Sequence, residues 1–152
     1  MAAWVRFGLL ALQGLQVAFL LLHDWVPLGR LSNLRAVRES DPPGKLLRVT
    51  LLSVLPFALV FAVCCAYWNA PRWPMWLQMW LWWTYGAAIV GTILAWWGPY
   101  LFWKSPERAE RYKVRFAGTI KVLPERNGIS PDALHVVYHL CIVGTLLLLA
   151  TL

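Results

Sequence analysis

Four long apolar runs alternate with three more polar connections along the chain. We place the runs at about residues 4–23, 46–68, 74–97 and 131–152. Each has close to the ~20 residues that an α-helix needs to cross a bilayer's hydrocarbon layer. Pro56 interrupts the second run, but a membrane helix tolerates such a kink because neighbouring helices satisfy the freed carbonyl. The pattern predicts an all-α, polytopic membrane protein, a four-transmembrane-helix bundle forming one domain over residues 1–152.

Composition supports this class. The chain is 60% hydrophobic and 14% charged, and a soluble domain of 152 residues would be far more polar. The first run carries Gln13 and Gln16, and no small-x-small cleavage pattern precedes His23. We therefore expect this run to be a retained membrane helix and not a signal peptide.

Basic residues gather in the first and third connections, at about residues 24–45 and 98–130. With four spans these two connections lie on one side of the membrane, and the positive-inside rule assigns that side to the cytoplasm. Both termini then lie on the non-cytoplasmic side, and we expect a bacterial inner (plasma) membrane. Anionic inner-leaflet headgroups and topology explain the net charge of +7 more simply than nucleic acid does.

The third connection contains the pattern of a short amphipathic helix. In SPERAERYKVRFA, Ser105 is a capping residue and Pro106 occupies the first helical position. Tyr112 and Phe116 share one face of this helix, and arginines share another. We expect an interfacial helix lying on the inner leaflet, with a solvated charged helix as the alternative.

The boundaries of the last two runs also have local signals. We expect Ser130 to cap the fourth run, Pro131 to open it, and residues 98–99 (Gly-Pro) to end the third. Ala87 and Gly91 form a small-xxx-small pair, which favours close contact between membrane helices.

The three histidines are predicted to lie in the same leaflet. His135 and His139 are four residues apart, so they share a helical face with Asp132. His23 and Asp24 end the first run, on the same side by the topology above. A histidine within a membrane segment is energetically costly and marks a candidate site. We predict a polar pocket here that opens to the cytoplasm.

Further polar side chains are expected to complete this pocket. They lie on the inward faces of the first and third runs and in the third connection: Gln13, Gln16, Gln78, Tyr85 and Arg115. The alternative is that these groups hydrogen-bond directly between tightly packed helices and leave no cavity.

Two kinds of chemistry suit such a pocket. His23, His135 and His139 are candidate metal ligands, although the glutamate of an HExxH motif is missing. Alternatively, His135, His139 and Asp132 are candidate catalytic groups for acid–base or proton-transfer work, because histidine titrates near neutral pH. The sequence names no cofactor, and a divalent metal stays open.

Three classes of function remain. The leading one is a small membrane protein that binds a small or lipophilic ligand, or moves a proton or cation. The second is a membrane-embedded enzyme acting on a lipid-like substrate, and the third is a non-catalytic accessory or scaffold subunit. The chain has no internal repeat of the kind found in many transporters, so we expect a homo-oligomer if it transports. The expected partners are membrane lipids and the ligand.

Overall fold

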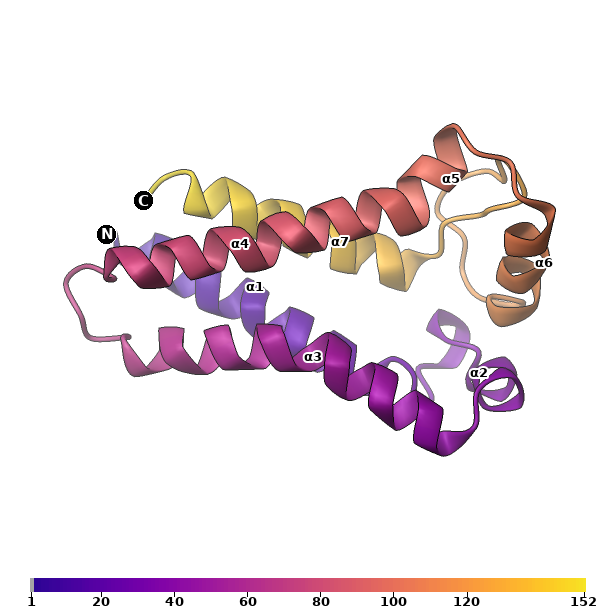
Figure 1. Ribbon diagram of the computed structural model, residues 1–152, viewed down its shortest axis with the longest axis horizontal. Coiled ribbons are helices and arrows are strands. Elements are labelled where there is room, and N and C mark those ends of the chain that lie inside the picture. The colour runs from indigo at the N-terminus through magenta and orange to yellow at the C-terminus, as the bar shows by residue number, and fades with distance from the viewer. Residues whose placement is uncertain (1) are drawn as a thin grey trace.

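Four long helices form the body of the protein, and they lie side by side in antiparallel order (Figure 1). The computed structural model describes residues 2–152. The four helices are α1 (Ala3–Leu22), α3 (Pro43–Ala66), α4 (Met75–Thr92) and α7 (Ala133–Leu149). The shorter elements are η1 (Gly29–Leu31), α2 (Leu34–Ser40), the π-helical η2 (Ile93–Trp97), α5 (Gly98–Leu101) and α6 (Pro106–Arg115). The described residues contain no strand, so the expected all-α class is confirmed.

The long helices pack as a ring in which each contacts two neighbours. Helix α1 lies between α3 and α7, and α4 lies between the same two helices on the other side. The interior contains one or more fully buried side chains from each helix, including Leu9, Val60, Leu81 and Ile142. The close helix contact that the Ala87/Gly91 pair permits is not made at Gly91, because a Cβ there would meet nothing within 4 Å.

The close approach lies instead between α1 and α7. A Cβ added at Gly8 would come within 2.9 Å of Leu148 Cδ1, so only glycine lets the two helices approach this far without a shift. Gln16 Nε2 donates a hydrogen bond across the same interface to Thr145 Oγ1, at 3.0 Å. The first and last helices are thereby held together by both packing and polar contact.

The outer faces of the bundle are apolar. Large exposed side chains occur on all four long helices, among them Trp4, Phe7, Leu52, Leu55, Trp83, Val90, Leu140 and Leu147. By length and composition, α1 and α3 are able to cross a membrane, and α7 is a shorter apolar helix of 17 residues. Two apolar helices compatible with membrane insertion are thus present.

Charged residues occupy one end of the bundle. The chain termini and the α3–α4 connection lie together at one end, and α2, α5 and α6 lie at the other (Figure 1). All seven acidic residues belong to the α2/α5/α6 end, and only Arg6 and Arg72 among the basic residues belong to the opposite one. The first and third connections therefore share an end, as the antiparallel order of helices requires.

These two connections also bind each other. The Ile120 N–H donates to Arg30 O at 2.9 Å, and Asn33 Nδ2 donates to Ala117 O at 3.1 Å. Helix α6 forms where the sequence predicts it, with the Ser105 hydroxyl accepting from the Arg108 N–H. Its apolar face packs on the bundle, because the ring of Tyr112 lies 5.0 Å from that of Trp96. That face is therefore not free to enter lipid.

Two predicted helix boundaries are wrong. Residues 98–99 do not end the third helix, because η2 and α5 continue it to Leu101. The fourth long helix begins at Ala133, and its capping residue is Asp132, whose carboxylate accepts from the His135 N–H at 3.2 Å. The Ser130 hydroxyl instead donates to Leu123 O. A carboxylate is an equally strong cap, so the local signal fitted either residue.

Candidate functional site

The three histidines meet at the α2/α6 end of the bundle. His23 lies at the C-terminal end of α1, whereas His135 and His139 lie in the first two turns of α7. The ring centroids of His23 and His135 are 5.8 Å apart, and those of His135 and His139 are 6.4 Å apart. The predicted convergence of residues from opposite ends of the sequence is present in the fold.

Two of the histidines pair with carboxylates. His23 Nε2 lies 3.2 Å from Asp24 Oδ2, and its Nδ1 lies 3.0 Å from the carbonyl oxygen of Phe19. Both facing atoms are acceptors, so both ring nitrogens of His23 are engaged within the protein. His135 Nδ1 lies 3.0 Å from Asp132 Oδ2. Each pair combines an imidazole, which can carry a proton, with a carboxylate, which can accept a hydrogen bond from it.

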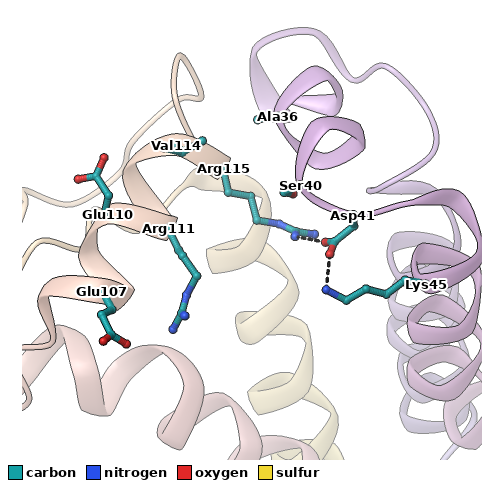
Figure 2. A pocket seen from close by; sticks show the side chains of 9 residues that line it. All are labelled: Ala36, Ser40, Asp41, Lys45, Glu107, Glu110, Arg111, Val114 and Arg115. Carbon is teal, nitrogen blue, oxygen red and sulfur yellow. Dashed lines mark hydrogen bonds and ion pairs between the residues drawn. The ribbon is translucent and has the colours of Figure 1, made fainter.

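Arg115 connects the histidine cluster to the first connection. Its guanidinium donates to Asp24 at 3.3 Å and to Asp41 at 2.9 Å, and Lys45 Nζ lies 2.7 Å from the same Asp41 carboxylate (Figure 2). Burial alone would raise the pKa of the Asp24 carboxyl, but the hydrogen bond and charge of His23, with Arg115, hold that pKa below its usual value. The Lys45 hydrogen bond lowers the pKa of Asp41 in the same way.

Aromatic rings surround the histidines. Trp96 stacks on His135 with ring centroids 4.4 Å apart, and Phe19 stacks on His23 at 4.5 Å. Trp96 lies in η2, where the Gly98 N–H bonds to Ile93 O five residues back. Such a π-helical turn adds one residue to the helical repeat and often occurs at functional sites. His139 is buried, and its Nδ1 has no hydrogen-bond partner within residues 2–152.

Several predicted pocket residues lie elsewhere. Gln78 lies in the first turn of α4, at the opposite end of the bundle, and its amide donates to Trp73 O. Tyr85 is fully buried in the core, and its hydroxyl has no partner among the described residues. The Gln13 amide is also fully buried and lies beside the Cys64 thiol. These three groups belong to helix packing and not to the histidine cluster.

Two hollows adjoin the cluster. One is a groove of about 260 Å³ along the outer face between α1 and α7. Its lining is apolar except at a few positions. The lining residues are Leu15, Gln16, Ala18, Phe19, Leu22, His23, Leu28, Leu134, Val137, Tyr138 and Cys141. The other is a charged cleft of about 740 Å³ between α6 and the segment from α2 to the start of α3. Arg115 lines the cleft and His23 lines the groove. Asp24 pairs with both side chains and thereby connects the two hollows.

The geometry gives the metal prediction no support. Within residues 2–152, no three or more His, Cys, Asp or Glu side chains are placed to hold a metal ion. The acid–base roles predicted for His135, His139 and Asp132 stay predictions.

Sequence reasoning missed Asp41, Lys45, Phe19 and Trp96. Asp41 and Lys45 are an i, i+4 pair at the start of a helix, which is a recognisable signal for an ion pair. The contact of Asp41 with Arg115, 74 residues away, has no signal in the sequence.

The chain resembles no known protein in three comparisons. No protein-family model, no curated protein and no solved structure matches it. The fold and the site therefore define its class by themselves: an all-helical protein with apolar helices and a histidine–carboxylate cluster at its charged end.

Proposed function

We propose that the protein is an integral membrane protein whose four long helices all cross the bilayer. The length and apolar composition of α1 and α3 support this, as do the large apolar side chains exposed on all four long helices. The charged α2/α6 end lies in the cytoplasm under the positive-inside rule, and both termini lie outside. A bacterial inner membrane is the expected location.

Within this arrangement, we propose that the protein binds a lipophilic ligand in the groove between α1 and α7. The observation that carries the proposal is the groove itself, an apolar hollow on a lipid-facing surface with one histidine, His23, among its lining residues. A volume of about 260 Å³ is at the small end for ligand sites. The groove would hold the polar head and the first part of a chain, and the rest would lie in lipid.

His23 would recognise the polar head of this ligand. Its ring is fixed by stacking on Phe19 and by the contact of Nε2 with Asp24. Both ring nitrogens already face acceptors in the protein, so the ring would meet the head of the ligand through its C–H edge and face and not as an N–H donor. Tyr138 stacks on the same Phe19, with ring centroids 4.4 Å apart, and lines the opposite wall of the groove. Flat or unsaturated ligands would find aromatic surface on both walls.

The groove can be tested by filling it. Val137 lines the groove and is 58% exposed, so Val137→Trp would occupy the ligand's volume without entering the core. Leu147→Trp is the matched control, because Leu147 lies on α7, is 66% exposed and lies outside the groove. We expect mass spectrometry of purified protein to find a co-purifying lipophilic molecule in wild type and in the control, and several-fold less in Val137→Trp. Equal amounts in all three proteins would refute the groove as the site.

Proton transfer is a second candidate function. Two histidine–carboxylate pairs with imidazole rings 5.8 Å apart favour it, together with the link from His23 through Asp24 to Arg115 at the cleft. Proton uptake by reconstituted vesicles, compared between wild type and His23→Gln, tests this role. Equal uptake in the two proteins would exclude His23 from a proton path.

The enzyme and scaffold alternatives give different results in the same experiments. An enzyme acting on a lipid-like substrate would convert the co-purified molecule when its cytoplasmic co-reactant is supplied. A scaffold would contain no such molecule, and His135→Ala/His139→Ala would change only its stability. Elemental analysis of the same samples tests the metal prediction: near-stoichiometric metal lost in that double variant would establish a metal site.

A further inference from the structure

The charged cleft at the α2/α6 end has features of a headgroup site that the groove does not explain. It has a volume of about 740 Å³ and lies between α6 on one side and Ala36–Lys45 on the other (Figure 2). The charged residues that line it are balanced, three basic and three acidic: Asp41, Lys45, Glu107, Glu110, Arg111 and Arg115. A balanced cleft has little net attraction for an anion but suits a ligand that carries both charges.

Some of these charges are already paired. Asp41 forms ion pairs with both Lys45 and Arg115, and Arg115 also forms one with Asp24. By contrast, the Glu110 side chain makes no hydrogen bond or ion pair within residues 2–152, and neither do those of Glu107 and Arg111 (Figure 2). Glu107 and Arg111 are four residues apart on α6, hence on one face, and that face borders the cleft. Two opposite charges are thus presented to the cleft without protein partners.

The position of the cleft matches the depth of lipid headgroups in the proposed membrane arrangement. Lys45 lies in the first turn of α3, directly before its apolar stretch, and α6 follows the last turns of the α4–η2–α5 helix. Helices α3 and α4 make the least extensive contact of the four neighbouring pairs and diverge toward this end (Figure 1). Acyl chains attached to a headgroup in the cleft can enter the lipid along this divergent seam.

We propose that the cleft binds the zwitterionic headgroup of a phosphoethanolamine lipid. Arg111 and Lys45 bind the phosphate from opposite sides, and Glu107 accepts hydrogen bonds from the ammonium group. An anionic lipid would leave Glu107 facing a negative ligand, and a choline headgroup has no N–H to donate. This inference rests on the part of the proposed function in which the helices cross the membrane. It does not depend on a ligand in the groove.

The test is lipid binding to delipidated full-length protein in detergent, measured by native mass spectrometry. The probes are phosphatidylethanolamine, phosphatidylglycerol and phosphatidylcholine with identical acyl chains. We expect wild type to bind phosphatidylethanolamine several-fold more tightly than the other two. Stronger binding of phosphatidylglycerol, or equal binding of all three, would overturn the assignment.

Single variants separate the two halves of the site. Arg111→Gln should weaken the binding of all three lipids about tenfold. Arg126→Gln, an exposed control outside the cleft, should change the binding of none of them. Glu107→Gln should remove only the preference for phosphatidylethanolamine over phosphatidylcholine, with Glu125→Gln as its control. Equal losses in a variant and its control would refute specific recognition.

Two further measurements identify the source of the headgroup and separate this inference from the groove. Soluble glycerophosphoethanolamine at millimolar concentration should not displace the lipid, because it lacks the acyl chains. Displacement would assign the cleft to a soluble phosphoamine instead. Val137→Trp should retain the headgroup preference, and Arg111→Gln should retain the groove ligand. Joint loss of both in Arg111→Gln would show a general structural defect and contradict a separate site.

Discussion

Replacing Arg115 by glutamine removes the one cation that joins both connections at the charged end. Its guanidinium contacts Asp24 and Asp41, whose side chains are only 10% and 16% exposed, while Arg115 itself is 32% exposed. An exposed ion pair contributes about 0–1 kcal/mol, and a hydrogen bond to a charged group about 1.5–3 kcal/mol. Arg115 lies between these limits, and His23 and Lys45 still partner the two carboxylates in its absence. We therefore expect a loss of about 2 kcal/mol.

The assay is thermal unfolding of detergent-solubilised protein, followed by tryptophan fluorescence. For a chain of this size about 2 kcal/mol corresponds to a fall of roughly 4–8 °C in the melting temperature. Arg35→Gln is the matched control, since Arg35 and Glu39 form an ion pair that is 89% and 63% exposed, and it should not shift the melting temperature measurably. A double-mutant cycle with Asp41→Asn should give a coupling energy above about 0.5 kcal/mol.

The reasoning would be refuted if the melting temperature of Arg115→Gln equalled that of Arg35→Gln. The bridge would then contribute no more than an exposed pair, and the hydrogen bonds of Ile120 and Asn33 would be what holds the first and third connections together.

Three other predictions concern single groups. Acidification should destabilise wild type below about pH 4, because Asp24 and Asp41 have folded pKa values below 3.8; their stabilising effect is complete above that pH and is lost as the pH falls through the folded pKa. Melting curves of Asp24→Asn/Asp41→Asn should be flatter over this range, and parallel curves would contradict the assignment. His139→Leu should hold or raise the melting temperature, since an unpartnered buried nitrogen costs about 1–3 kcal/mol; a fall of several degrees would mean that the imidazole has a stabilising partner. Gly128→Ala should speed proteolysis of the third connection, because φ is 77° there and the new Cβ would lie 2.3 Å from that of Ala109, whereas Gly118→Ala, with φ of 72° and open space, should have a smaller effect.

Much of the architecture could be predicted from the sequence because it depends on local patterns. Apolar runs of helical length predict the long helices, and a serine–proline start predicts α6. The meeting of His23 with His135 follows from counting antiparallel helices, since an even number of crossings brings the end of α1 to the start of α7. This argument needs no knowledge of side-chain packing.

The rest depends on tertiary contacts that have no local signal. The ring order of the helices decides that Tyr85 faces the core. Gln78 is remote from the histidines because it lies in the first turn of α4, at the opposite end of the bundle, which the same count of antiparallel helices predicts. The π-helical turn at Ile93–Trp97 places Trp96 over His135, yet the apolar residues in it fit an ordinary α-helix equally well. The contacts of Arg115 likewise depend on how α6 docks, which a charge pattern on one helix does not determine.

The extensive contact between α1 and α7 has a consequence for the order of assembly. The first of the four long helices to be synthesised has its largest interface with the last of them, so the bundle cannot close until α7 has been synthesised. Until then, the Gln16 amide lacks its Thr145 partner and the α1 wall of the groove has no opposite side. During this interval α1 and α3, which also contact each other, form a hairpin with an unsatisfied interior face. Shielding this face until α7 arrives would therefore raise the yield of folded protein.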